Sequence, residues 1–348
     1  MQTKLKVKPN IEELVKTIKR GKGSFIPIAE LGVHPLIKEK FIGRKITTLE
    51  DEIEFWYGAG YDYIKLQPVA DFNPAKIGIE NNLMLFKDGT SIRKWASEKK
   101  GVITNIKEYE SYLFPSSSDF NYKNFELVST ILPEGMGVIG QYGDIFTMTW
   151  EMMGFEAFSF ALYENPELVY ELNNKLGELV VSMFEFFAQS DIVNILWYSD
   201  DIAYRNGLLA SPEVLDGLFF RWLRKIGKLC KEYNKPLIYH SDGILFPIME
   251  NIIECGVDAL HPIEPKAMSI VEVKERYGDK LSLIGNIEVD LLARGTPEEV
   301  KKSVLKNIEL VGMNGGYCVG SSNSIPEYIN FENYITMIRT VKEFSFGS

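Results

Sequence analysis

The chain of 348 residues contains little cysteine and little histidine, three residues of each. The odd and sparse set Cys230, Cys255 and Cys318 is not typical of a disulfide framework and indicates a reducing compartment. No uncharged apolar run approaches the roughly 18–20 residues of a membrane span. No apolar segment follows the N-terminal charges, as one does in a secretory signal. We therefore expect a cytoplasmic protein.

Positive charge is also scarce. The 38 basic residues are outnumbered by 48 acidic residues, which gives a formal net charge of −10, and no long run of Lys and Arg is present. This balance disfavours nonspecific binding to nucleic acid or to an anionic membrane surface. Hydrophobic residues make up 45% of the chain, which is typical of a globular protein with ample material for a core.

Short β-branched or apolar runs alternate along the chain with longer segments of helical periodicity. Ser211 and Thr296 each precede a proline and a glutamate, which is the pattern of a helix N-cap. Two further helices are expected over residues 166–187 and 330–344. The predicted strands are Phe25–Glu30, Tyr63–Gln67, Gly137–Gln141, Val193–Asp200, Pro236–His240, Ala259–Ile263, Leu281–Ile287 and Gly316–Gly320.

About eight strands alternating with helices predict an α/β fold of the (β/α)8 TIM-barrel type; the alternative is an open doubly wound sheet. Polar residues follow the carboxyl ends of the strands, where barrel enzymes place their chemistry, and this favours the barrel. We expect a single domain over residues 1–348, with an N-terminal extension and an insertion at about 70–130. The polar residues at strand ends are Glu30, Gln67, Gln141, Asp200, Asp201, His240, Asp242, Glu264, Asn286 and Cys318.

His240, Asp242 and Cys318 form the main candidate site. His240 and Asp242 lie two residues apart at the end of a predicted strand, so their side chains share one face. Cys318 lies near the end of the last predicted strand, and in a closed barrel the three would meet as nitrogen, oxygen and sulfur ligands that suit zinc. The alternatives are that His240 acts as a general acid or base, that Asp242 caps the next helix, and that Cys318 is a small buried hydrophobe.

Other polar residues are candidates around this site. Asp200 and Asp201 are adjacent, so only one of them would face the cavity of the barrel, and the alternative is that they cap a helix or turn. Glu30 is a candidate further metal ligand, and Gln141 and Asn286 are candidates for contacting substrate or cofactor. Asn286 could instead hold a neighbouring loop.

The two remaining histidines are given structural roles. His34 precedes a proline and is interpreted as a loop residue. His261, which also precedes a proline, is interpreted as packing against the barrel.

Several of these motifs together resemble the uroporphyrinogen decarboxylase superfamily. The likeness covers the C-terminal half well and is weaker in the first third, and it implies a (β/α)8 barrel with its site at the carboxyl-end mouth. The motifs that carry it are Ser199-Asp200-Asp201-Ile202-Ala203, His240-Ser241-Asp242-Gly243, Gly285-Asn286-Ile287, Arg294-Gly295-Thr296-Pro297-Glu298-Glu299-Val300 and Gly315-Gly316-Tyr317.

The resemblance implies one of two activities. The true decarboxylases hold a tetrapyrrole's carboxylates with arginines near the N-terminus, but the corresponding stretch here, residues 26–35, has no arginine and contains Glu30. The second branch consists of cobamide-dependent methyltransferases with a His-x-Cys pair and a distant cysteine on zinc. His240, Asp242 and Cys318 resemble that pattern, with an aspartate in place of its first cysteine, and the His-Ser-Asp-Gly form resembles the O-demethylase components.

The resemblance therefore implies a zinc-dependent methyltransferase that moves a methyl group between a small donor, such as an aryl methyl ether, and the corrinoid of a partner protein. Asp200 or Asp201 would orient the substrate or supply a proton, together with His240. Two alternatives remain open: a metal-free decarboxylase or lyase on the same barrel, and a non-enzymatic protein that binds a tetrapyrrole or corrinoid.

Overall fold

The computed structural model describes residues 8–69 and 101–346. The insertion expected at about 70–130 lies partly outside these residues. Its described portion, from residue 101 onward, contains two short helices, α4 (Ile106–Ser111) and α5 (Lys123–Ile131). The division of the chain into one domain with an insertion stays a prediction.

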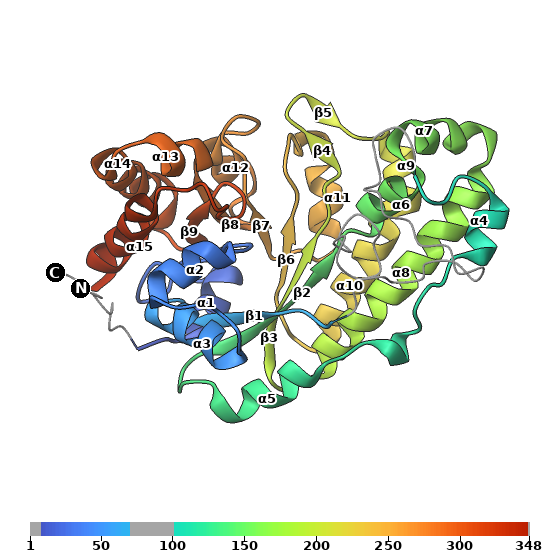
Figure 1. Ribbon diagram of the computed structural model, residues 1–348. Coiled ribbons are helices and arrows are strands. Elements are labelled where there is room, and N and C mark those ends of the chain that lie inside the picture. Colours follow the sequence, from blue (N-terminus) through green and yellow to red (C-terminus); the bar gives the residue numbers. More distant parts are fainter. Residues whose placement is uncertain (1–7, 70–100, 347–348) are drawn as a thin grey trace.

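A curled parallel sheet forms the centre of the molecule, with its strands in sequential order (Figure 1). This order confirms the barrel-type α/β fold, because an open doubly wound sheet would reverse its strand order partway across. In the described part of the chain, the seven strands of this sheet are β1 (Tyr63–Leu66), β2 (Gly137–Gly143), β3 (Val193–Ser199), β6 (Leu237–His240), β7 (Ala259–His261), β8 (Ser282–Ile287) and β9 (Tyr317–Ser321).

The predicted first strand, Phe25–Glu30, is reduced to a single bridge between Ile28 and Val319. It lies beside β9, because the Val319 amide donates to the Pro27 carbonyl at 3.0 Å. Pro27 has no amide hydrogen to donate, which weakens a ladder at this point. Toward β1 the Glu30 amide donates to the Tyr63 hydroxyl at 2.8 Å instead of to a backbone carbonyl. This segment occupies the eighth position of the barrel.

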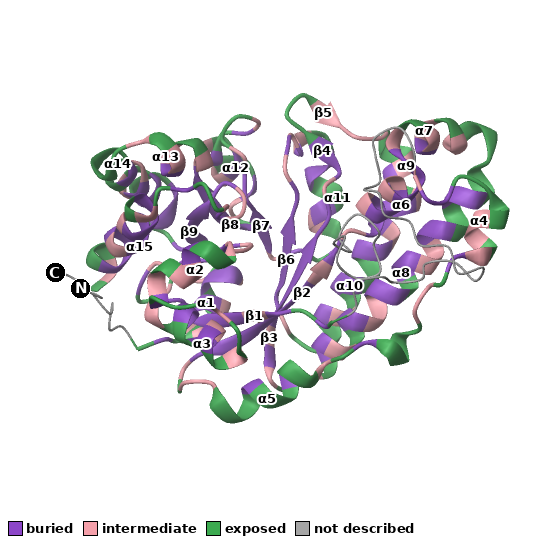
Figure 2. Ribbon diagram, in the orientation of Figure 1, coloured by how far each residue is buried: buried purple, intermediate pink, exposed green. Residues whose placement is uncertain are grey.

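The helices pack around the outer face of the sheet, and the strands are the most continuously buried part of the molecule (Figure 2). The first three helices lie beside the last one in Figure 1, and Tyr61, which follows the third helix, has its hydroxyl 2.8 Å from that of Tyr334 in the last helix. The remaining helices are α1 (Ile11–Ile18), α2 (Pro35–Ile42), α3 (Leu49–Gly58), α6 (Ile145–Met153), α7 (Phe155–Glu164), α8 (Pro166–Gln189), α9 (Pro212–Leu215), α10 (Arg221–Glu232), α11 (Met249–Glu254), α12 (Ile270–Tyr277), α13 (Val289–Arg294), α14 (Pro297–Asn307) and α15 (Phe331–Phe346).

The helix starts expected from the sequence are present. The Ser211 side chain accepts a hydrogen bond from the Val214 amide, and Thr296 forms a capping box with Glu299. His34 is the N-cap of α2, where its Nδ1 accepts from the Leu36 amide at 3.3 Å. Within the described residues, every helix is too short or too polar to span a bilayer.

The carboxyl ends of the parallel strands meet at one end of the barrel, its mouth. The short antiparallel strands β4 (Ala203–Tyr204) and β5 (Gly207–Leu208) form a hairpin directly after β3 at this end. Residues paired in register on neighbouring parallel strands point to the same side of the sheet. Ser199 pairs with His240, and His240 pairs with His261, so these three side chains share the inner side.

Candidate functional site

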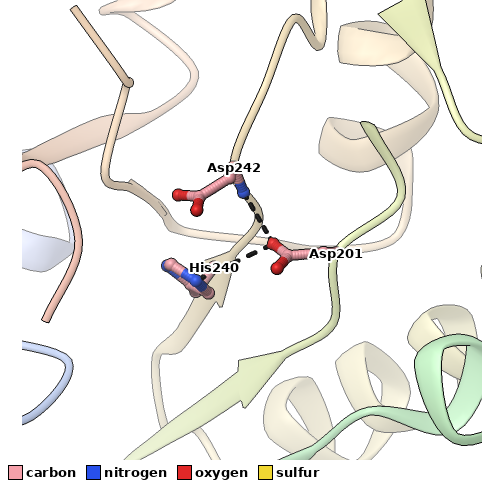
Figure 3. Close-up of side chains that lie close together, drawn as sticks. All are labelled: Asp201, His240 and Asp242. Carbon is pink, nitrogen blue, oxygen red and sulfur yellow. Dashed lines mark hydrogen bonds and ion pairs between the residues drawn. The ribbon is translucent and has the colours of Figure 1, made fainter. Parts of the chain in front are cut away.

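The residues that could hold a metal at the mouth are Asp201, His240 and Asp242 (Figure 3). One ligand atom from each lies within 4.8 Å of the others. His240 is the last residue of β6, Asp242 follows it by two residues, and Asp201 follows the end of β3. The structure therefore brings together two of the three residues expected from the sequence and supplies Asp201 as the third.

Of the adjacent acids, only Asp201 faces this cluster. Asp200 is fully buried and accepts hydrogen bonds from the amides of Phe146 and Thr147, at 2.7 and 2.9 Å, and from the Tyr198 hydroxyl at 2.7 Å. It therefore satisfies amides in the first turn of α6. Burial raises the pKa of Asp200 to about 6. Asp201 by contrast is 46% exposed, and its Oδ1 accepts from the Asp242 amide at 2.8 Å.

The ionised form of the Asp242 carboxylate is disfavoured by its surroundings. Its Oδ2 accepts a hydrogen bond from the Asn323 side chain at 2.5 Å, but its buried Oδ1 has no partner within the described part of the chain. Burial first, and then the negative charges of Asp201 and Glu264, raise the pKa of Asp242 to about 7. The side chain pairs across the mouth with the loop after β9, so it is not acting as the helix cap considered above.

A second histidine supports the first. The Nδ1 atoms of His240 and His261 are 2.7 Å apart, so one donates a proton to the other. Burial lowers the pKa of both imidazoles, which favours their neutral forms. The Nε2 of His240 is 3.9 Å from Asp201 Oδ1, on the side of the cluster. The interpretation of His261 as a packing residue missed this contact, which follows from the pairing of β6 with β7.

Cys318 does not lie in the cluster. The strand β9 runs to Ser321, so Cys318 is three residues before the end of its strand, whereas His240 is the last residue of its own. Cys318 is fully buried, and burial raises its pKa well above its ordinary value. Cys230 and Cys255 are buried as well.

Glu30 is also outside the cluster. It is fully buried and accepts hydrogen bonds from the amide and the hydroxyl of Ser321, at 2.8 and 2.6 Å. Burial raises the pKa of Glu30 to about 8. Through these two bonds it ties the Phe25–Glu30 segment to the end of β9.

Gln141 and Asn286 have different surroundings. Gln141 is part of a chain at the mouth, where it accepts from Gln67 at 2.6 Å and donates to the Ser199 hydroxyl at 3.1 Å. Asn286 donates to the Ile263 carbonyl at 2.8 Å and accepts from Asn307 at 3.0 Å. Asn286 thus holds the segment after β7, which is the alternative considered for it, while Gln141 belongs to the polar chain at the mouth.

A cavity of about 410 Å³ opens beside the cluster at Asp242. Its wall is predominantly acidic, since its one lysine, Lys266, is paired with Glu288 and Asp290. A polyanion approaching this part of the mouth would be repelled. The residues that line the cavity are Asp242, Glu264, Pro265, Lys266, Glu288, Val289, Asp290, Ser322, Asn323, Ser324, Pro326 and Tyr328.

The chemistry of the cluster fits a divalent cation. One imidazole nitrogen and two carboxylates are ligands that zinc accepts. A cation would also give the unpaired Asp242 Oδ1 a partner and would offset the repulsion that raises the pKa of Asp242. Neither Cys318 nor Glu30 is needed for this set. These observations support a metal at Asp201, His240 and Asp242.

The sequence is similar to a known protein family and to several of its members. The family model "Uroporphyrinogen decarboxylase (URO-D)" matches residues 89–344. The uroporphyrinogen decarboxylase of Pseudoalteromonas translucida is 26% identical over 242 residues, and the match covers 63% of each chain, less than two thirds of that enzyme. The uroporphyrinogen decarboxylase of Pseudomonas syringae pv. tomato is 25% identical over 270 residues, which are 71% of each chain.

The fold also has a relative among solved structures. The "methyltransferase from Methanosarcina mazei" superposes with a TM-score of 0.69 at 16% sequence identity, and the match covers 95% of this chain and 98% of that one. At this level of identity the likeness establishes a shared fold.

Proposed function

This chain belongs to the uroporphyrinogen decarboxylase family, and from that premise we propose that it is a zinc-dependent methyltransferase. It would move a methyl group between a small donor, such as an aryl methyl ether, and the corrinoid of a partner protein. The observation that carries the proposal is the Asp201–His240–Asp242 cluster, whose unpaired buried oxygen lies at the barrel mouth. The methyltransferase of the same fold from Methanosarcina mazei supports it.

Asp201, His240 and Asp242 would hold the metal. When bound, the metal supplies a Lewis acid that polarises the oxygen leaving the methyl group. His261 orients the His240 ring: if His240 offers its Nε2 lone pair to the metal, its Nδ1 carries the proton and donates to His261 Nδ1. The Asp242 amide fixes Asp201 Oδ1, and the exposed side chain of Asp201 lies where it can orient a substrate or exchange a proton with it.

The acidic cavity disfavours the rival reading as a porphyrinogen decarboxylase. A tetrapyrrole carrying several carboxylates would have to approach Asp242, Glu264 and the other acids of the cavity wall. The stretch over residues 26–35 also offers no arginine to hold such carboxylates. A metal-free reaction would leave Asp242 Oδ1 buried without a partner.

The proposal can be tested by metal analysis and a methyl-transfer assay. Protein purified without oxygen should bind about one zinc per chain, and His240→Ala and Asp242→Asn should lose it. Asp290→Asn, which changes an acid of the same mouth outside the cluster, is the matched control and should retain zinc. Cys318→Ser should retain zinc too, because Cys318 lies outside the cluster.

Methyl transfer would be followed from a panel of methoxylated compounds to reduced cobalamin through the absorbance of methylcobalamin. Transfer that requires zinc, His240 and Asp242 supports the assignment. A wild-type protein that binds no zinc, or one that decarboxylates uroporphyrinogen after treatment with a chelator, would contradict it.

A further inference from the structure

Three buried polar atoms next to the metal cluster have no hydrogen-bond partner among the residues that the structure describes: Lys65 Nζ, Trp197 Nε1 and His261 Nε2. Buried polar groups in proteins nearly always have a partner, and one left without a partner costs about 1–3 kcal/mol. None of these three atoms is used by the proposed metal site. Together they indicate that something else binds at this place.

The side chains of the three residues are neighbours. Lys65 Nζ lies 5.1 Å from the centroid of the Trp197 ring, and the rings of Trp197 and His261 are 5.2 Å apart and inclined by 68°. Lys65 is on β1, two residues before Gln67, and Trp197 is on β3, two residues before Ser199. Side chains two residues apart on a strand face the same side of the sheet, so Lys65 and Trp197 face the same side as the Gln67–Gln141–Ser199 chain. They lie one step further from the mouth than that chain.

All three atoms are hydrogen-bond donors. A lysine ammonium and an indole nitrogen can only donate. In a neutral His261 whose Nδ1 accepts from His240, the remaining proton is on Nε2, so this atom donates as well. Three unpartnered donors on neighbouring side chains match a ligand that offers oxygen lone pairs and negative charge, such as a carboxylate.

Within residues 8–69 and 101–346, no carboxylate forms an ion pair with Lys65. Glu30 is near enough to influence the pKa of Lys65, but both of its oxygens accept from Ser321. Lys65 as a residue keeps part of its surface exposed, and Gln67 beyond it is exposed, so the place can be reached from the mouth.

We propose that Lys65, Trp197 and His261 form a subsite for the single carboxylate, or an equivalent oxyanion, of the small methyl donor. This inference rests on the proposed function, since it assigns a substrate class to the same site. The rings of His240 and His261 are 4.9 Å apart, so the subsite adjoins the metal cluster. A compact methoxylated acid would place its methyl ether at the cluster and its carboxylate against Lys65. The acidic cavity beside the cluster would repel larger polyanions.

The test compares charged and neutral probes of one shape by titration calorimetry on the zinc-loaded protein. The charged probes are methoxyacetate and the 2-, 3- and 4-methoxybenzoates; the neutral probes are 1,2-dimethoxyethane and the methyl esters of the benzoates. We expect wild type to bind at least one charged probe about tenfold or more tightly than its neutral counterpart, as expected for hydrogen bonds to a buried ammonium. Lys65→Met should abolish this preference with its zinc content unchanged.

Lys266→Met is the matched control, because Lys266 is a lysine of the same mouth that is already paired with Glu288 and Asp290. It should keep the preference for the charged probe. Thermal unfolding of Lys65→Met checks that the variant folds. If Lys65→Met keeps the wild-type preference, or if wild type binds no charged probe more tightly than its neutral counterpart, the subsite is overturned.

The same experiment separates the two proposals. Binding of a methoxylated acid that depends on Lys65, without methyl transfer from any donor, would retain the subsite and overturn the proposed function. Zinc-dependent transfer from neutral ethers that Lys65→Met does not affect would retain the function and overturn the subsite.

Discussion

Asp242→Asn should change the stability of the protein in opposite directions with and without zinc. The substitution keeps the size of the side chain and an oxygen that can accept from Asn323, but it removes the negative charge. A carboxylate crowded by Asp201 and Glu264 destabilises the metal-free protein, whereas the same carboxylate is needed to bind a cation. A residue with only a structural role would not show this reversal.

The magnitude follows from the pKa of Asp242. Folding raises it from 3.8 to about 7, so stability is fully present below about pH 4 and is lost as pH rises toward 7. Above pH 7 the loss is at most about 4 kcal/mol, and solvent screening at this partly exposed side chain reduces it to about 1–2 kcal/mol. Asp242→Asn removes this cost, so the metal-free variant should melt about 1–3 °C above wild type at pH 8.

Zinc should reverse the order of the melting temperatures of wild type and Asp242→Asn. At a concentration 100 times its dissociation constant, a ligand stabilises the folded state by about 2.7 kcal/mol. Wild type should gain this stabilisation and the variant should gain little, since it lacks one of three ligands. The assay is thermal unfolding at pH 8 with a chelator and then with added zinc, and Asp290→Asn is the control that should respond to zinc as wild type does.

Two outcomes would refute this reasoning. If Asp242→Asn melts below wild type in the chelator, the carboxylate stabilises the metal-free fold and the repulsion assigned to it is wrong. If zinc raises the melting temperature of wild type and variant equally, Asp242 does not bind the metal.

Three further predictions follow from the same region. Asp200→Asn should lower the free energy of unfolding by about 2–3 kcal/mol in urea titration. The amides of α6 and the Tyr198 hydroxyl donate to the Asp200 carboxylate, and in the variant one of these donors would face the NH2 group of the asparagine. An unchanged midpoint of unfolding would contradict the capping role. His261→Phe should weaken zinc binding by about 10–100-fold in a competition titration, because it removes the group that orients His240, and unchanged affinity would show that His240 needs no support. Burial lowers the pKa of Lys65 from 10.5 to about 7, so the charged lysine destabilises the folded protein. Lys65→Met should therefore raise the free energy of unfolding by about 1–2 kcal/mol below pH 7, and this gain should disappear toward pH 10.5. A gain that does not change with pH would contradict a charged buried lysine.

Much of the fold was predictable because it depends on local patterns. The alternation of apolar runs and helical segments predicted seven strands to within about two residues of their observed ends, and Ser211 and Thr296 marked helix starts correctly. Phe25–Glu30 was expected as a full strand, but it keeps one bridge, because Pro27 cannot donate to a neighbour. Local pattern gives the position of a strand, whereas its pairing depends on its neighbours.

The site was harder to predict because it depends on register. Catalytic residues of barrel enzymes lie at the carboxyl ends of the strands. This rule predicted His240, Asp242, Asp200 and Asp201 as site residues. It could not tell which acid faces the cluster, since that depends on how the chain turns after β3. The rule also selected Cys318, but the structure places this residue three positions before the end of β9 and outside the cluster. His261 was missed because its contact with His240 arises only from the pairing of β6 with β7.

Lys65 had a signal in the sequence that was not used. Parallel strands buried on both faces are continuous apolar runs, so a lysine inside Tyr63–Leu66 is out of place by pattern alone. The structure gives that exception a physical meaning, because the ammonium has neither a carboxylate partner nor a hydrogen bond among residues 8–69 and 101–346. Its charge is opposite to that of the acids at the mouth. A cation held at Asp201, His240 and Asp242 would offset the nearest of these acids, so metal binding should also make the approach of a monoanion to Lys65 more favourable. Zinc should therefore tighten the binding of methoxybenzoate to wild type and have a much smaller effect in Asp242→Asn, a coupling that calorimetry with and without zinc can measure directly.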